Sequence, residues 1–318
     1  AAQRVIAKEA SVATYIVRRL LIAIPVIWGV ATIVFFLMRI LPGDPAQMML
    51  ASVGGNADQI ATLRESLGLN DPLIVQYGKF MANLAQGDLG NSLRSNQPVT
   101  REIAAQLGNT VQLTVASMAI ALVLGIVLGV ASAIWRQSWI DSVAMSIAMV
   151  GICAPNFWLG LMLISIFSFT LNWFPATGSE GLSRLVLPAI TLGLGSAAVI
   201  ARLVRSSMID VLQQDYIAVS RAKGLAESQV MLGHALRNAL IPAVTLAGLQ
   251  FGTLLGGAVI VETVFSRQGI GRLAVNAIVA KDYTVVQGVV LFVAAAYVLI
   301  NLAIDVLYVF LDPRIRYS

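Results

Sequence analysis

The chain contains few of the residues that catalytic and redox sites need. It has one cysteine and one histidine in 318 residues. A single cysteine, Cys153, excludes an internal disulfide framework and a cysteine-rich metal site. No G-x-x-x-x-G-K-[ST] sequence occurs, so the chain has no Walker phosphate loop and cannot be its own ATPase. The apolar stretches also lack H-E-x-x-H, clustered acids and a Ser–His–Asp set, which argues against an intramembrane enzyme.

Charge is scarce as well. Only 12% of residues are charged and 58% are hydrophobic, with a mean hydropathy of +0.83, whereas a soluble domain is about one quarter charged. A helix that crosses a bilayer needs about 20 apolar residues. The sequence therefore predicts an all-α polytopic membrane protein with six transmembrane helices. The uncharged stretches that predict them are Leu20 to Met38, Ile103 to Trp135, Ser142 to Ser179, Leu185 to Ala201, Asn238 to Val261 and Tyr283 to Ile304.

The predicted spans contain almost no buried charge. Glu262 and Asp305 lie only near the ends of the fifth and sixth stretches, whereas proton- or voltage-driven machines need charge along their path. Any translocation path would then be lined by uncharged polar groups and powered elsewhere. The alternative is that these groups bond to neighbouring helices. The candidate path residues are Asn109, Thr110, Gln112 and Asn156.

The first apolar stretch follows Arg18 and Arg19, as in a signal peptide, but it is too long for one. We expect a retained first helix over 15–40. The segment 1–14 is either a short interfacial helix or a remnant of cloning. Lys and Arg concentrate in the short loops that are cytoplasmic if the N-terminus is cytoplasmic. Both termini, including the tail 311–318, are therefore predicted to be cytoplasmic, and the net charge of +5 indicates topology rather than nucleic-acid binding.

Residues 41–102 form a long polar connection, predicted to be a small extracytoplasmic subdomain before a core over 103–310. Proline and glycine mark turns in it, and apolar spacing predicts short helices over Asp58 to Leu67 and Leu73 to Ala85. It is either a folded cap or a surface that docks a partner.

Proline and glycine inside the spans predict kinks and close helix contacts. Pro25, Pro155, Pro188 and Pro242 each remove a backbone donor, and the stretch Asn172 to Gly178 is read as a turn. Small residues at intervals of four let another helix approach, either in ordinary packing or at a sliding subunit seam. These residues are Gly125 and Gly129 in the second stretch and Gly248, Gly252 and Gly256 in the fifth.

A polar stretch over 215–242, DYIAVSRAKGLAESQVMLGHALRNALIP, interrupts the apolar chain. Arg221, Lys223, His234 and Arg237 lie among apolar residues at helical spacing, which is typical of a docking surface. This stretch resembles the EAA loop of bacterial ABC importer permeases, whose pattern is E-A-A, three residues, glycine, nine residues and I-x-L-P. Gly224 matches the glycine, and the spacing is kept although several letters differ. Ala218, Val219 and Ser220 take the E-A-A positions, and His234, Ala235, Leu236 and Arg237 the last four.

The string RAKGL followed by HALRNALIP resembles the dipeptide, oligopeptide and nickel branch of these permeases, which also includes glutathione importers, and its B-type subunit in particular. The resemblance spans nearly the whole chain from Tyr15. It includes LPGDP, LGLNDPLIVQY, GDLGNS, GGAVIVETVFSRQGIGRL, KDYTVVQG and DPRIRY. It implies the type I ABC importer permease fold and a location in the bacterial inner membrane.

The resemblance also implies a cytoplasmic coupling loop over 209–238, with a coupling helix from Asp215 to Met231 seated in a groove of an ATPase subunit. Arg221 and Lys223 would meet its carboxylates or backbone carbonyls, and Gly224 would permit a sharp turn or a close backbone approach. The coupling residues are expected to be Asp215, Tyr216, Ala218, Ser220, Arg221, Ala222, Lys223, Gly224, His234 and Arg237.

The implied partners are a second related permease subunit, two ATPase subunits that bind ATP and Mg, and a periplasmic or lipid-anchored solute-binding protein. The chain itself would hold no cofactor. The expected solute is a dipeptide or oligopeptide, with nickel complexes or glutathione as alternatives. Two other classes of protein fit the composition. One is a self-sufficient secondary carrier or channel, and the other is a membrane scaffold that recruits a partner. The absence of an internal repeat disfavours the carrier.

Overall fold

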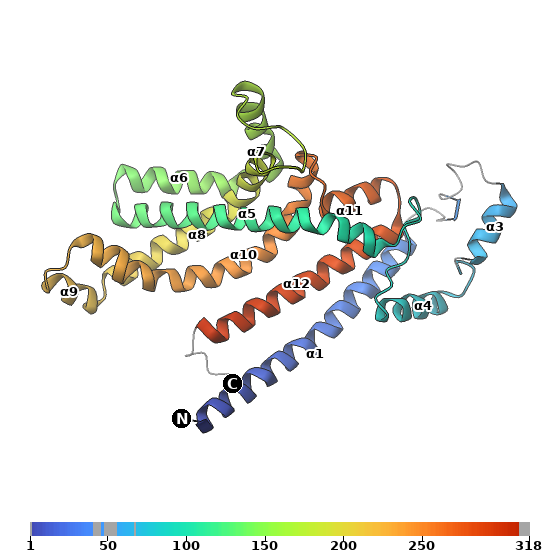
Figure 1. Cartoon of the computed structure of the whole chain (residues 1–318), viewed down its shortest axis with the longest axis horizontal. Helices are drawn as coiled ribbons and strands as arrows, with labels where there is room; N and C mark the ends of the chain where they lie inside the picture. Colours follow the sequence, from blue (N-terminus) through green and yellow to red (C-terminus); the bar gives the residue numbers. More distant parts are fainter. Residues whose placement is uncertain (1, 41–45, 48–55, 67, 312–318) are drawn as a thin grey trace. The chain divides into compact units, whose positions relative to one another are not determined.

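The structure is a computed structural model that describes residues 2–40, 46–47, 56–66 and 68–311. Every element over these residues is helical, apart from one isolated bridge between Asn91 and Pro98. Figure 1 shows the helices along the chain, several of them long. The elements are α1 (Ala2–Ile40), α3 (Ala57–Ser66), α4 (Leu73–Ala85), α5 (Val99–Ile134), α6 (Trp139–Cys153), α7 (Asn156–Leu163), the π-helix η1 (Ile164–Thr170), α8 (Ser183–Leu212), α9 (Asp215–Ala222), the π-helix η2 (Gln229–Ala235), α10 (Leu236–Val264), α11 (Ile270–Val279) and α12 (Tyr283–Leu311).

Five helical stretches of the described chain are long and apolar enough to cross a membrane: Val17–Ile40, Val99–Ile134, Ser183–Leu212, Gln229–Val264 and Tyr283–Ile304. The third predicted stretch, Ser142 to Ser179, is a pair of helices, Trp139–Cys153 and Asn156–Thr170, which are bent by 113° at the break between them. The protein is thus an all-α polytopic membrane protein with five spans, or six if the bent pair counts as one.

Pro155 explains the bend. Ala154 has extended backbone angles, as the position before proline favours, and Pro155 is the N-cap residue that precedes α7. The other three prolines lie inside continuous helices, Pro25 in α1, Pro188 in α8 and Pro242 in α10. The turn predicted near Asn172 is confirmed, because helix ends at Thr170 and Asn172 has a φ of 53°.

The chain divides into two compact units, one of residues 1–108 and 272–318, the other of residues 109–271. In the first unit α1 packs along α12. The predicted helices of the polar connection are confirmed as α3 and α4, and α4 packs against α1. There the Tyr77 hydroxyl lies 2.8 Å from Thr32 Oγ1, and the rings of Tyr77 and Phe80 contact Phe35.

In the second unit α8 packs against α6, α7 and α10. Glycine permits the closest contacts. A Cβ on Gly125 would lie 2.7 Å from Ile200, and one on Gly129 would lie 2.6 Å from the carbonyl oxygen of Ala201. The close approach predicted for these two glycines is confirmed.

The glycines of the fifth predicted span behave differently. Gly252 is buried and Gly248 half-buried, but Gly256 is exposed, and no described residue lies within 4 Å of the position of its Cβ. The contact of α10 with α8 is made instead by neighbouring residues such as Gly257, whose Cβ would lie 2.9 Å from Leu192.

Candidate functional site

The segment between α8 and α10 combines exposed charge with exposed apolar side chains. α9 begins after Gln214, whose extended backbone ends the preceding turn. Asp215 in its first turn and Arg221 in its last turn both suit the helix dipole. Ile217 is fully buried against the cluster that contains Met208 and Val230. A single apolar side chain therefore anchors α9, and the rest of its surface is open.

Gly224 ends this helix. It has a φ of +76°, in the left-handed region that glycine alone enters without strain. Apart from its two chain neighbours, no described residue has an atom within 4 Å of the position of its Cβ. Of the two roles expected for Gly224, the structure therefore shows the sharp turn and no close approach within this chain. The prediction of one helix from Asp215 to Met231 is wrong, because α9 stops at Ala222 and a separate π-helix, η2, begins at Gln229.

An ion pair spans the turn at Gly224. Arg221 donates from Nη2 to Glu227 Oε1 at 2.7 Å and from Nε to Oε2 at 3.1 Å. The guanidinium hydrogen-bonds the carboxylate and lowers the pKa of Glu227, and the carboxylate in turn raises the pKa of Arg221. Arg221 thus already has a carboxylate partner within the chain. The sequence analysis missed Glu227. The one feature of the sequence that could have indicated it is an acidic residue that follows Gly224 by three positions, opposite Arg221.

Tyr216 ties α9 to the start of α10. Asn238 donates from Nδ2 to the Tyr216 hydroxyl at 2.8 Å and to the His234 carbonyl at 3.2 Å. Ser220 donates its hydroxyl to the Tyr216 carbonyl at 2.7 Å. These bonds hold both ends of the segment together and leave the His234 and Arg237 side chains exposed.

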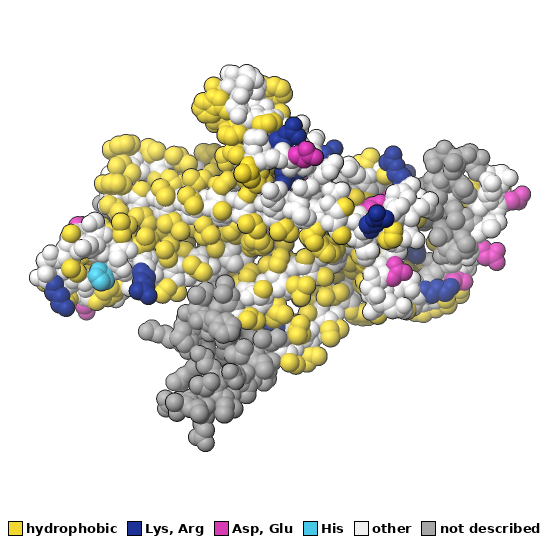
Figure 2. All heavy atoms as spheres, in the orientation of Figure 1, with side chains coloured by type: hydrophobic (Ala, Val, Ile, Leu, Met, Phe, Trp, Pro, Cys, Tyr) yellow, Lys and Arg dark blue, Asp and Glu magenta, His cyan; other side chains and the backbone are white. Residues whose placement is uncertain are grey.

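A groove of about 540 Å³ runs along η2. It is lined by Leu225, Ser228, Gln229, Leu232, Gly233 and His234. Leu232 is 59% exposed and Leu225 38% exposed, so apolar surface faces outward beside basic residues. Figure 2 shows the histidine on the surface close to basic side chains. π-Helical turns are frequent at functional sites, and the arrangement suits a partner with an apolar ridge and acidic groups.

The structure gathers the predicted coupling residues on this one segment. Ser220 is half-buried and the others are exposed: Asp215, Tyr216, Ala218, Arg221, Ala222, Lys223, Gly224, His234 and Arg237. Among the described residues Lys223 makes no ion pair, so its ammonium group is available to a partner.

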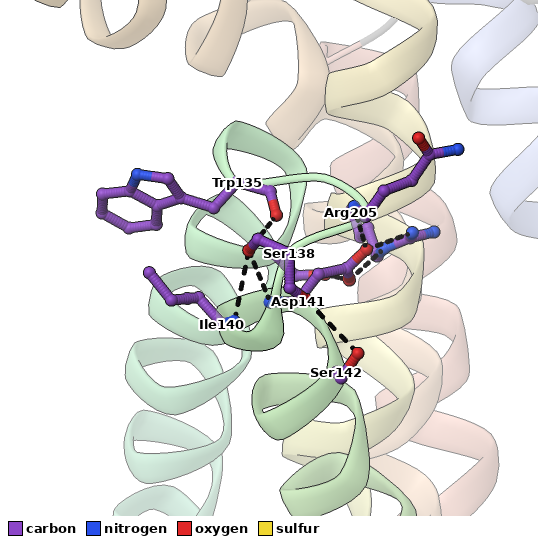
Figure 3. A network of polar contacts seen from close by, with 8 residues as sticks. Trp135, Ser138, Ile140, Asp141, Ser142 and Arg205 are labelled. Carbon is purple, nitrogen blue, oxygen red and sulfur yellow. Dashed lines mark hydrogen bonds and ion pairs between the residues drawn. The ribbon is translucent and has the colours of Figure 1, made fainter.

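A second polar cluster binds α8 to the α5–α6 hairpin, on the N-terminal side of the segment between α8 and α10. Arg205 donates from Nε to Asp141 Oδ1 and from Nη2 to Asp141 Oδ2, both at 2.9 Å. Ser132 donates its hydroxyl to the same carboxylate, and the Gln137 N–H lies 3.0 Å from Oδ2. Figure 3 shows the Asp141–Arg205 pair, with Ser138 capping the start of α6. The α5–α6 hairpin is thereby fixed to α8. Sequence reasoning used Arg205 only as a sign of topology and missed Asp141.

The candidate path residues fall into two places. Thr110 is buried, donates to Glu262 Oε1 at 2.6 Å and accepts from the Ile270 N–H at 2.9 Å. Gln112 accepts from Arg267 Nη2 at 2.7 Å, and Asn109, half-buried, lies beside Thr110 in α5. Asn156 lines a different pocket, between the α6–α7 bend, α8 and α10. Facing the solute remains a prediction for all four.

The first of these places explains the sequence run ETVFSRQGIG. Glu262 is fully buried and also accepts from the Gly271 N–H at 2.8 Å. A Cβ on Gly269 would lie 2.2 Å from that carboxylate, so glycine is required there. Arg267 is buried too and donates to the Ser179 carbonyl at 3.2 Å. The hydrogen bonds of this run therefore hold the turn after α10 against the N-terminal half of α5.

Residues 125–317 match the family described as binding-protein-dependent transport system inner membrane component, and residues 12–114 match its N-terminal family. The chain belongs to this family. It is the permease component of an ABC importer, a multi-pass inner membrane protein and not itself an enzyme.

The permease is similar over its whole length to curated relatives. It is 46% identical over 304 residues to the glutathione transport system permease protein GsiC of Salmonella choleraesuis (strain SC-B67), covering 96% of this chain and 99% of the relative. It is 45% identical to GsiC of Escherichia coli (strain K12), with the same coverage.

Solved structures show the same fold. A chain of the inward-facing MetNI methionine ABC transporter has a TM-score of 0.58 at 20% identity, covering 67% of this chain and 97% of that one. A chain of an amino acid ABC transporter with histidines has a TM-score of 0.51 at 19% identity, covering 68% and 95%. The expected permease fold is thereby confirmed.

Proposed function

We propose that this permease forms half of the translocation pathway of an ATP-driven importer for small peptides, and that its solute is of the glutathione type. The observation that carries the solute class is the 46% identity with glutathione transport permeases along nearly the full length of both chains. Dipeptides and oligopeptides are the broader class to which glutathione belongs. Nickel complexes, the other expected alternative, have no support from these relatives.

The coupling site is the exposed segment from Asp215 to Arg237. A two-state transporter needs an element that moves with its ATPase and is held firmly by the membrane helices. The buried Ile217 and the hydrogen bond from Asn238 to Tyr216 hold the segment to the membrane helices, and the groove along η2 supplies the contact surface. Two separate ATPase subunits bind ATP and Mg below this surface.

The remaining partners follow from the same proposal. A second related permease completes the pathway, and the exposed face of α10 at Gly256 suits a close helix contact at their seam. With both termini and the coupling loop in the cytoplasm, α3 and α4 lie outside, where a periplasmic or lipid-anchored solute-binding protein docks. ATP then drives alternating access, which needs about 5.5 kcal/mol of differential binding to invert a two-state population.

The test is purification of the chain from its native membrane, followed by uptake assays in vesicles. Two ATPase subunits and a second permease should copurify, and glutathione uptake should require ATP and the binding protein. Recovery of the chain alone with ATP-independent uptake would overturn the proposed assembly. ATP-dependent uptake of other solutes but not of glutathione would overturn the solute class only.

A further inference from the structure

A pocket of about 290 Å³ lies within the second unit, where the α6–α7 bend meets α8 and α10. This volume is close to the lower end of ligand pockets, which begin at about 300 Å³. Its polar side chains come from three helices: Asn156 from α7, Ser196 from α8, and Gln250 and Thr253 from α10. None of the residues that line it is charged. The pocket can therefore recognise hydrogen-bonding groups but not charges.

Ser196 provides the strongest indication of a ligand. It is only 7% exposed, yet its hydroxyl makes no hydrogen bond within the described chain. Other buried hydroxyls of this unit donate to the carbonyl four residues earlier, at 2.8 Å in Thr114, Ser117 and Thr191. Ser196 lines the pocket, and its hydroxyl oxygen is not among the fully enclosed unpartnered polar atoms of the described chain, so it is accessible to a group that enters the pocket.

The two amide side chains add complementary groups. Gln250 accepts from the Thr253 hydroxyl at 2.8 Å, which uses its carbonyl oxygen and leaves its NH₂ group for a ligand. The Asn156 side chain makes no hydrogen bond within the described chain, so both its carbonyl and its NH₂ group remain. The pocket thus offers donors for a carbonyl oxygen and an acceptor for an N–H, the two groups of a peptide unit.

Glycine keeps this space open. A Cβ on Gly195 would lie 3.2 Å from the Gly151 carbonyl oxygen, and one on Gly257 would lie 2.9 Å from Leu192 and 3.5 Å from the Asn156 amide nitrogen. Side chains at Gly195 and Gly257 would therefore take up space beside Asn156 and Ser196. Backbone rather than side chain forms this part of the wall, as at sites that a ligand approaches closely.

We propose that this pocket binds the peptide amide group of the transported solute through Asn156, Ser196 and Gln250. The inference rests on the proposed function and names the part of the solute that the permease itself recognises. Because the residues that line the pocket carry no charge, the permease hydrogen-bonds to the peptide bond. The binding protein recognises the charged ends of the solute.

The experiment uses the intact transporter, reconstituted in vesicles with its binding protein. Two probes are compared: glutathione, and glutathione methylated at both of its peptide nitrogens, which has no peptide N–H donor. Ser196→Ala and Asn156→Leu are measured against Ser117→Ala, a matched control whose hydroxyl already bonds to the Leu113 carbonyl. The binding protein is the same throughout, so the ratio of variant to wild type isolates the permease.

The expected result is a drop in kcat/KM for glutathione of about three- to tenfold in each pocket variant, the size of one lost neutral hydrogen bond. The methylated probe should lose less in Asn156→Leu, because it cannot use the asparagine carbonyl, and Ser117→Ala should leave both probes near wild type. Equal losses for both probes in Asn156→Leu, or wild-type uptake in both pocket variants, would overturn the pocket assignment while the proposed function stands. A wild-type transporter without ATP-dependent glutathione uptake would overturn both.

Discussion

Two arginines of this permease each hold a carboxylate with two nitrogens, but in opposite surroundings. The side chains of Arg205 and Asp141 are 30% and 10% exposed, and they join α8 to the α5–α6 hairpin. The side chains of Arg221 and Glu227 are 43% and 55% exposed, and they span the turn at Gly224. The first pair lies between packed helices and the second in solvent. The Arg205–Asp141 pair should therefore contribute strongly to the stability of the helix packing. The Arg221–Glu227 pair should only slightly favour the conformation of the turn at Gly224.

Breaking the buried pair should have the largest effect. Asp141→Ala leaves the Arg205 guanidinium without its partner among packed helices, and we expect the free energy of unfolding to fall by about 2–3 kcal/mol, slightly less than for a fully buried pair. Thermal unfolding of the purified permease measures it. Arg202→Ala is the matched control, since Arg202 is exposed on the same helix and makes no ion pair with described residues. Equal destabilisation by both changes would contradict the distinction drawn here.

A change at the turn tests the exposed pair's surroundings. Gly224→Val places a β-branched residue at a φ of +76°, which should destabilise the loop by about 1–3 kcal/mol. Solute uptake should fall more than about tenfold if the turn orients the proposed coupling surface. Gly224→Asn is the informative control, because asparagine tolerates left-handed angles and should keep most of the activity. If Gly224→Asn reduced uptake as much as Gly224→Val, the cause would be a steric clash between the new side chain and a partner rather than backbone strain.

The exposed pair itself should contribute least. Glu227→Gln removes the ion pair and should change stability only slightly, because both side chains are solvated. The pKa of Glu227 is lowered in the folded protein. Its stabilising contribution is therefore fully present above its unfolded pKa of about 4.3, and it is lost as the pH falls through the lower folded value.

The measurement is the difference in unfolding free energy between wild type and Glu227→Gln, at neutral pH and below about pH 4. The difference should shrink at the lower pH, where the wild-type carboxylate also becomes neutral. A difference that grows on acidification would mean that the carboxylate is less stable as an anion in the folded state, contrary to its contact with Arg221.

Long apolar stretches located five of the spans well, because hydropathy is a local property of the sequence. The polar stretch 215–242 interrupts the apolar chain, and the structure has the two short elements α9 and η2 within it. The extent of its helices was not predicted, because helical periodicity continues on both sides of Gly224 and does not show that α9 stops at Ala222. Pro155 was one of four predicted kinks, and the sequence did not show that it alone would break its helix.

The sequence by itself determined the helical membrane class, the helices of the 41–102 connection, the close packing at Gly125 and Gly129, and the position of the polar segment. These depend on composition, on short-range spacing and on the missing Cβ of glycine. Only the tertiary structure decided that Asp141 pairs with Arg205, that Thr110 and Glu262 bond to each other, and that the Ser196 hydroxyl opens into a pocket with Asn156. Each of these partners is distant in the chain, and packing alone brings such groups within hydrogen-bond distance and leaves one of them without a partner.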